Sequence, residues 1–124
     1  MKIDQRALDV GLAVWYFCVS WEGAADGRLR LGEARTFLTA YQRRLQEESD
    51  CPPLSAVEIR CLPHLINAGK IYVVYWTPRD SFGKSADPTE YLVYLQHGVA
   101  FARWFDRPVN WLKLEAMLAG LPHP

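Results

Sequence analysis

The side chains that could perform chemistry in this chain are few and widely separated. His64, His97 and His123 stand alone, without the HxxxH or CxxC spacing that typically supplies a zinc site. The phosphate-binding patterns GxGxxG and GxxxxGK are absent, and so is the GxSxG turn that presents a serine nucleophile. A nucleophile and base brought together only by folding are the alternative. The sequence therefore predicts neither a metal site nor a complete catalytic centre.

The carboxylate, thiol and indole groups each have a structural interpretation. Asp4 and Asp9 lie five residues apart, a spacing that does not share a helix face well, so Asp9 is interpreted as a cap that accepts backbone amides. Cys18 lies in an apolar run, where cysteine packs as a small hydrophobic residue. Three cysteines without close spacing favour reduced thiols. The five tryptophans are interpreted as core or interface anchors, with an aromatic ligand pocket as the alternative.

The composition indicates a single folded domain across residues 1–124. Half of the residues are apolar and 13% are aromatic, far from the composition of disordered chains. Fourteen basic residues balance fourteen acidic ones, which gives no long-range attraction to nucleic acid or to an anionic membrane. The apolar run at residues 10–19 is too short to span a bilayer, and no small-residue cleavage site follows it. We therefore expect no nucleic acid or membrane partner, and a cytoplasmic location.

Hydrophobic patterning predicts that helices position these residues. Residues 4–20 are apolar on every side after Asp9, which indicates a helix in the middle of the core, with a buried strand as the competing interpretation. Residues 31–47 show the clearest amphipathic pattern, with Leu38 on the apolar face and Gln42 on the polar face.

Start and stop signals define the remaining helices. A Ser-x-x-Glu capping box starts a helix at Ser55, and Pro63 should kink or split this helix. Residues 71–76 are expected to be helical, although they also have strand propensity. Two further helices are expected at residues 87–105 and 108–118, each with a proline in its first turn. The predicted fold is mainly α, a compact bundle of about five helices.

Five segments follow one another in an order that is typical of one enzyme superfamily. They are residues 6–13 (RALDVGLA), 21–29 (WEGAADGRL), 34–41 (ARTFLTAY), 53–63 (PLSAVEIRCLP) and 87–92 (DPTEYL). Their order and spacing resemble the helical carboxy-terminal part of the aminoglycoside phosphotransferase superfamily, which includes type II homoserine kinases and choline kinases. The resemblance covers nearly the whole chain, from Arg6 to Leu118.

The resemblance implies which roles are present and which are missing. The family's catalytic loop, H-x-D-x-x-x-x-N, and its metal-binding D-F-D/E motif have no counterpart, because Asp4 lies too close to Asp9 to replace the metal-binding aspartate. ATP and magnesium are therefore implied for a full-length family enzyme, and no cofactor for this chain alone. Asp9 resembles the family's structural aspartate that braces the catalytic loop through backbone amides. Tyr72 and Trp76 lie where family members line the acceptor-substrate pocket.

Three functional interpretations follow. In the first, the chain is the carboxy-terminal subdomain of a small-molecule phosphotransferase, a truncated or split product or an isolated piece, whose partner is the missing amino-terminal kinase portion. It is then not expected to transfer phosphate alone. In the second, it is a non-enzymatic helical interaction or dimerisation domain descended from that subdomain. In the third, it is an unrelated helical bundle. An uncovered face of the first helix would drive self-association, through side chains from among Leu12, Trp15, Tyr16 and Val19.

Overall fold

The computed structural model describes residues 5–48, 50–71 and 88–122, and this part of the chain is mainly helical. Its elements are α1 (Gln5–Cys18), the short 3₁₀ helix η1 (Gly23–Ala25), α2 (Leu31–Glu47), α3 (Ala56–Asn67), the single turn α4 (Gly69–Ile71), α6 (Pro88–Phe105) and α7 (Pro108–Ala119). Between the helices, an isolated antiparallel bridge joins Val19 to Leu29. The mainly α bundle that the sequence predicts is thus confirmed.

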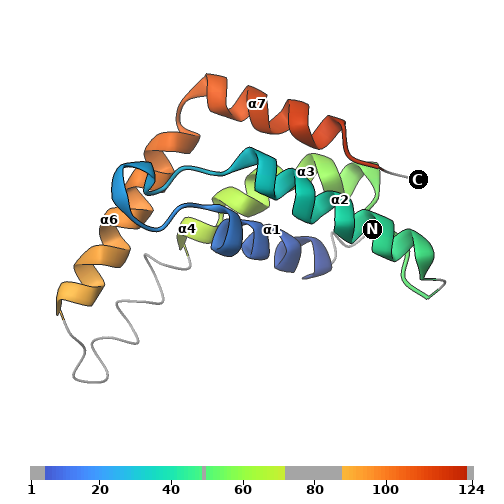
Figure 1. The fold of residues 1–124 in the computed structure, drawn as a ribbon, viewed down its shortest axis with the longest axis horizontal. Coiled ribbons are helices and arrows are strands. Elements are labelled where there is room, and N and C mark those ends of the chain that lie inside the picture. The colour runs from blue at the N-terminus through green and yellow to red at the C-terminus, as the bar shows by residue number, and fades with distance from the viewer. Residues whose placement is uncertain (1–4, 49, 72–87, 123–124) are drawn as a thin grey trace.

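The helices are arranged around the α2–α3 pair. Figure 1 shows α7 along one side of this pair, α1 along the other, and α6 crossing one end. α1 packs most extensively against α3 and less so against α2, while α7 covers both α3 and α2. Side chains from all five long helices meet in one core, which includes Val14, Leu38, Leu62, Phe101 and Leu114, each fully buried.

α1 is an edge helix with a single buried stripe. Its buried residues recur three and four positions apart, as one face of a helix requires: Ala7, Val10, Gly11, Val14, Trp15 and Cys18. On the other side, Tyr16 and Phe17 are 57% and 64% exposed. The expectation of a helix surrounded by protein on most faces is therefore wrong. Apolar residues also occupy its outer face, so the sequence pattern alone does not show which face is buried.

Two glycines allow α1 to lie directly on its neighbours. A Cβ atom on Gly11 would lie 2.8 Å from the Cβ of Leu65 and 3.1 Å from its carbonyl carbon. A Cβ atom on Gly69 would lie 2.5 Å from Cγ of Trp15. Both distances are shorter than van der Waals contact allows, so no larger residue fits at either position without moving α1.

Most predicted helix boundaries are confirmed. α2 has the predicted bounds, and α6 and α7 begin at Pro88 and Pro108. The capping box is present: Ser55 Oγ accepts the Glu58 amide at 3.2 Å, and Glu58 Oε1 accepts the Ser55 amide at 3.1 Å. Pro63 does not split α3, which continues to Asn67. Of the segment expected at residues 71–76, Ile71 ends α4 and the remainder lies outside the described residues.

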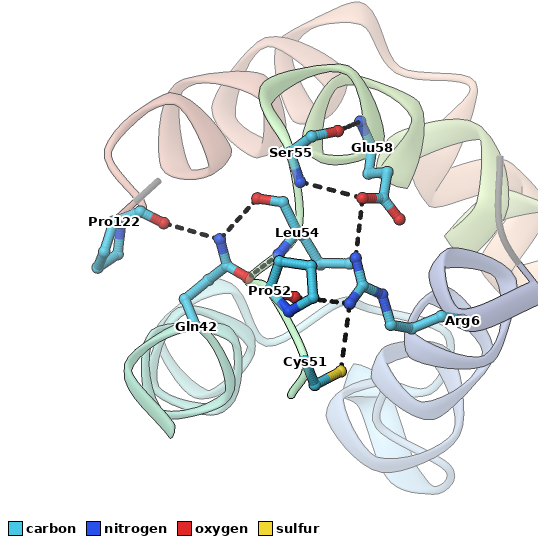
Figure 2. Close-up of polar contacts among 8 residues, drawn as sticks. All are labelled: Arg6, Gln42, Cys51, Pro52, Leu54, Ser55, Glu58 and Pro122. Atoms are coloured by element: carbon cyan, nitrogen blue, oxygen red, sulfur yellow. Dashed lines mark hydrogen bonds and ion pairs between the residues drawn. The ribbon is translucent and has the colours of Figure 1, made fainter. Parts of the chain in front are cut away.

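Gln42 is buried, contrary to its expected place on the polar face of α2. Its side chain is fully buried, and Oε1 accepts the Leu54 amide at 2.8 Å. Nε2 donates to the Leu54 carbonyl at 3.0 Å and to the Pro122 carbonyl at 2.9 Å. Figure 2 shows this amide between the segment that precedes α3 and the end of the chain after α7. One side chain thereby ties three segments together and satisfies the backbone amide and carbonyl of Leu54.

Arg6 anchors the start of α1 to the same region. Nη2 lies 3.0 Å from Glu58 Oε1, and Nη1 donates to the Pro52 carbonyl at 2.6 Å and to Cys51 Sγ at 3.5 Å (Figure 2). Burial alone would lower the pKa of Arg6, but the Cys51 contact and the Glu58 carboxylate raise it above its ordinary value. The guanidinium therefore stays charged, and Glu58 serves both the helix cap and the α1–α3 contact.

We expect Gln42→Leu to destabilise the chain strongly. The substitution keeps the volume but leaves the Leu54 amide and two carbonyls without partners, and each buried polar group left unpaired costs about 1–3 kcal/mol, so the loss should exceed about 2 kcal/mol. Gln46→Leu, at an exposed position one turn further along α2, is the matched control and should stay within about 0.5 kcal/mol. Urea unfolding measures both variants. Equal midpoints for the two would contradict the role assigned to Gln42.

Candidate functional site

The outer face of α1 carries the residue that the sequence analysis singled out most clearly, Asp9. Asp9 lies within α1, one turn after its start, and its side chain is exposed. No hydrogen bond or ion pair joins its carboxylate to any described residue. The interpretation of Asp9 as a cap for this chain's own backbone is therefore wrong, because α1 begins four residues earlier and its first amides lie elsewhere.

Asp9 borders an open hollow that we name the Asp9 pocket. The pocket has a volume of about 350 Å³ and is lined by Asp9, Leu12, Ala13, Trp15 and Tyr16. Apart from the carboxylate, every lining side chain is hydrophobic or aromatic. A single unpaired carboxylate at the edge of an apolar surface can accept two or more hydrogen bonds from a segment that covers it. The pocket therefore combines an apolar surface with one free hydrogen-bond acceptor.

The four residues expected to form a self-association face do not all reach the surface. Trp15 is only 4% exposed and Val19 is fully buried, where it pairs with Leu29 across the isolated bridge. Leu12 is half-buried, and Tyr16 is exposed. Phe17, which the sequence analysis did not select, is more exposed than any of them. Trp15 and Val19 are thus core residues, and the exposed part of this face consists of Leu12, Tyr16 and Phe17.

Trp15 is the centre of an aromatic cluster beneath the Asp9 pocket. Its ring meets Trp21 edge-on at 5.3 Å and Phe101 at 6.1 Å between centroids. Trp21 in turn donates its indole N–H to the Tyr16 carbonyl at 2.9 Å, which folds the chain back over the end of α1. The cluster joins α1 to α6, so the wall of the pocket is rigidly supported.

A buried histidine–carboxylate pair lies beside this cluster. His97 is fully buried, and its Nδ1–H donates to Asp26 Oδ1 at 2.5 Å. Trp21 stacks on the imidazole, with centroids 3.7 Å apart and planes 7° from parallel. The pair resembles the base and orienting acid of a hydrolase. However, Nε2 is buried with no hydrogen-bond partner among the described residues, and Trp21 covers the ring. The arrangement fixes the loop at Asp26 and does not present a base to a substrate.

Other chemical groups are placed in structural roles. Burial raises the pKa of the Cys18 thiol, and all three cysteines are free. Across residues 5–48, 50–71 and 88–122, no three histidine, cysteine or acidic side chains gather as a metal site would require. No helix within the same ranges is both long and apolar enough to cross a membrane. Tyr72 and Trp76, the expected acceptor-pocket residues, lie outside the described residues.

Sequence reasoning missed Asp26 and His97 as a pair, and it missed the burial of Gln42. Asp26 has the composition signal of a turn, and His97 stands alone in its helix. Asp26 and His97 are 71 residues apart along the chain, and Gln42 is 80 residues from Pro122. No local spacing in the sequence could indicate these contacts. The structure places His97, which stands alone in the sequence, in the core.

We expect Asp9→Ala to leave the stability of the chain almost unchanged. An exposed side chain without a partner contributes little, and alanine favours the helix, so the change should stay within about 0.5 kcal/mol. Ser55→Ala is the comparison, because it removes a cap that is present and should cost about 0.5–2 kcal/mol. Urea midpoints would decide between the two. A loss for Asp9→Ala as large as that for Ser55→Ala would mean that its carboxylate does support the fold.

No relative among known proteins supports or contradicts these observations. Neither the profiles of protein families, nor the curated proteins, nor the solved structures contain a match to this chain. The resemblance to the phosphotransferases therefore rests on the five sequence segments alone.

Proposed function

We propose that this chain is the helical carboxy-terminal subdomain of a small-molecule phosphotransferase, of the aminoglycoside, homoserine or choline kinase-like type. The observation that carries the proposal is the exposed, unpartnered carboxylate of Asp9 at the edge of an apolar pocket. In the resembled enzymes, the corresponding helix lies under the catalytic loop, and its aspartate accepts backbone amides of that loop. The exposed carboxylate of Asp9, with its oxygens free to accept hydrogen bonds, supports this role.

The lining of the Asp9 pocket supports a protein segment as the occupant. Leu12, Ala13 and Tyr16 present apolar surface next to one charge, and such a surface gains free energy when a chain segment covers it. Hydrogen bonds from backbone amides to a carboxylate are charge-assisted, and they strengthen when the covering segment excludes water. Asp9 would then position the catalytic loop without contacting the nucleotide.

On this proposal the chain supplies support and part of an acceptor site, and no phosphoryl-transfer chemistry of its own. Phosphoryl transfer requires groups that hold the phosphates and metal ions that neutralise their charge. In the resembled enzymes these come from the nucleotide-binding lobe, the H-x-D-x-x-x-x-N loop and the D-F-D/E motif, with ATP and magnesium bound between them. The partner of this chain is accordingly the amino-terminal kinase portion, and Tyr72 and Trp76 are proposed to face its acceptor substrate.

The proposal predicts that the chain alone neither binds nor hydrolyses ATP in the presence of magnesium. Calorimetry should show no heat of nucleotide binding, and phosphate release should equal that of buffer. Turnover that disappears in Asp9→Asn would contradict the proposal, since Asp9 would then act on the substrate.

The coding sequence upstream of the Met1 codon provides a second test. A reading frame that encodes H-x-D-x-x-x-x-N and D-F-D/E would supply the missing parts. The product of that frame, expressed with this chain, should then bind it and show kinase activity. Asp9→Ala should weaken that complex, whereas Glu22→Ala, another exposed acidic residue, should not. A frame without either motif would leave the dimerisation interpretation.

A second candidate function is a non-enzymatic dimerisation domain, and the exposure of Tyr16 and Phe17 favours it. Two copies that pair these faces would bury both aromatic rings, each worth roughly 1.5–3 kcal/mol when fully removed from water. Symmetric pairing of one face with its copy is the simplest such assembly.

Sedimentation at micromolar concentration tests this candidate. We expect a dimer that Phe17→Ser converts to monomer. Leu112→Ser is the matched control, because Leu112 is equally exposed at 64% but lies on α7. A monomer at all concentrations, with tryptophan fluorescence unchanged by dilution, would reject dimerisation.

A further inference from the structure

We propose that a second hollow, between the loop after η1 and the end of α6, binds a small phosphate monoester. We name it the arginine pocket. It has a volume of about 210 Å³, and Arg28, Arg103 and Arg107 line it together with Asp26 and Trp104. This site is independent of the proposed function, because none of its residues lines the Asp9 pocket.

The backbone that carries Arg28 is held firmly in place. Gly27 has a φ of +82°, and a Cβ atom there would lie 2.5 Å from the backbone of Ala100 and Phe101 on α6. The Ser20 amide donates to the Arg28 carbonyl at 2.9 Å, and the Gly27 amide donates to the Ser20 carbonyl at 2.8 Å. Only glycine allows the loop to approach α6 this closely, so Arg28 is brought to the same hollow as the α6 arginines.

The opposite wall comes from the junction of α6 and α7. Arg103 lies in the last turn of α6, and Arg107 is the residue that precedes α7. Trp104, between them, is half-buried and packs edge-on against Phe105 at 5.1 Å. Asn110 Nδ2 donates to the Trp104 carbonyl at 2.9 Å, which ties the junction to α7. The two arginines and the indole are thus presented by ordered helix ends.

None of the three arginines forms an ion pair with a described acidic residue, although Asp26 lines the same pocket. Elsewhere Arg6, Arg30 and Arg44 each pair with a glutamate. By contrast, no ion pair or side-chain hydrogen bond of Arg28, Arg103 or Arg107 occurs within the described part of the chain. Like charges that line one pocket repel one another, and solvent screens part of this repulsion at exposed positions, so an anionic ligand would reduce what remains.

The charge of the pocket matches a phosphate monoester. Asp26 contributes one negative charge, and its Oδ1 is already bound by His97, so about two positive charges remain. A phosphate monoester carries about −1.5 to −2 charges at neutral pH and has three terminal oxygens that accept the paired N–H groups of arginine. The hollow is too small for a folded partner or a nucleic-acid strand. Its volume suits the phosphate and a small organic group, which the flat face of Trp104 would contact.

Titration with phenyl phosphate tests the proposal, with the indole N–H signal of Trp104 as the readout and Trp104→Phe used to assign it. We expect a saturable shift at millimolar concentration. The Arg103→Gln/Arg107→Gln double variant should weaken binding by at least about tenfold, because each lost hydrogen bond to a charged group is worth roughly that factor. Both residues are exposed, so the variant should remain folded, which circular dichroism would verify.

Controls separate a built site from general charge attraction. The Arg35→Gln/Arg43→Gln double variant removes the same net charge from exposed positions of α2 and should bind within about twofold of the parent chain. Phenol should produce no saturable shift, and inorganic phosphate should bind more weakly than phenyl phosphate. Equal weakening in both double variants, or no saturable shift with phenyl phosphate, would overturn the site. Equal affinity for inorganic phosphate would overturn its assignment to an ester.

Discussion

The close packing of α1 against α3 and α4 is the constraint on which the rest of this structure depends. Gly11 lies against the backbone at Leu65, and Gly69 lies against the indole of Trp15. Since neither position has room for a Cβ atom, glycine at both positions allows α1 to approach α3 and α4 this closely. Trp15 is thereby inserted between α4 and α6, where it meets Trp21 and Phe101. The position of α6, and of the loop that packs on it, follows from this insertion.

The same constraint decides which residues α1 presents to the outside. With Gly11 and Trp15 turned inward, the helical repeat of 3.6 residues places Asp9 and Tyr16 on the outer side. The exposure of Asp9 and Tyr16 therefore follows from the orientation of α1 alone. A helix whose inner face is fixed by close packing also holds its outer face rigidly, which is what a surface needs if it is to support a catalytic loop or a second copy.

Local signals predicted the fold well, while long-range contacts were beyond the sequence. The bounds of α2, the capping box at Ser55 and the prolines that begin α6 and α7 all depend on neighbouring residues, and they could be predicted. The burial of Gln42 depends on backbone groups at Leu54 and Pro122, which folding alone brings together. For Asp9, the predicted contacts with this chain's own backbone amides are absent among the described residues. From the sequence alone, a carboxylate near the start of a helix can be the capping residue or can lie one turn inside. The structure decides between them, because it shows where the helix begins.

Asp26 connects the aromatic core to the arginine pocket. His97 holds the Asp26 carboxylate from inside, and Trp21 stacks on that same histidine, so the loop between α1 and α2 is fixed on both sides. A carboxylate committed to a buried imidazole is less available to the arginines beside it. One carboxylate cannot balance three guanidinium groups, so part of the positive charge of the arginine pocket remains. Among the described residues, the packing that orders α1 thus leaves a carboxylate without an ion pair on one surface and three guanidinium groups without ion pairs on another.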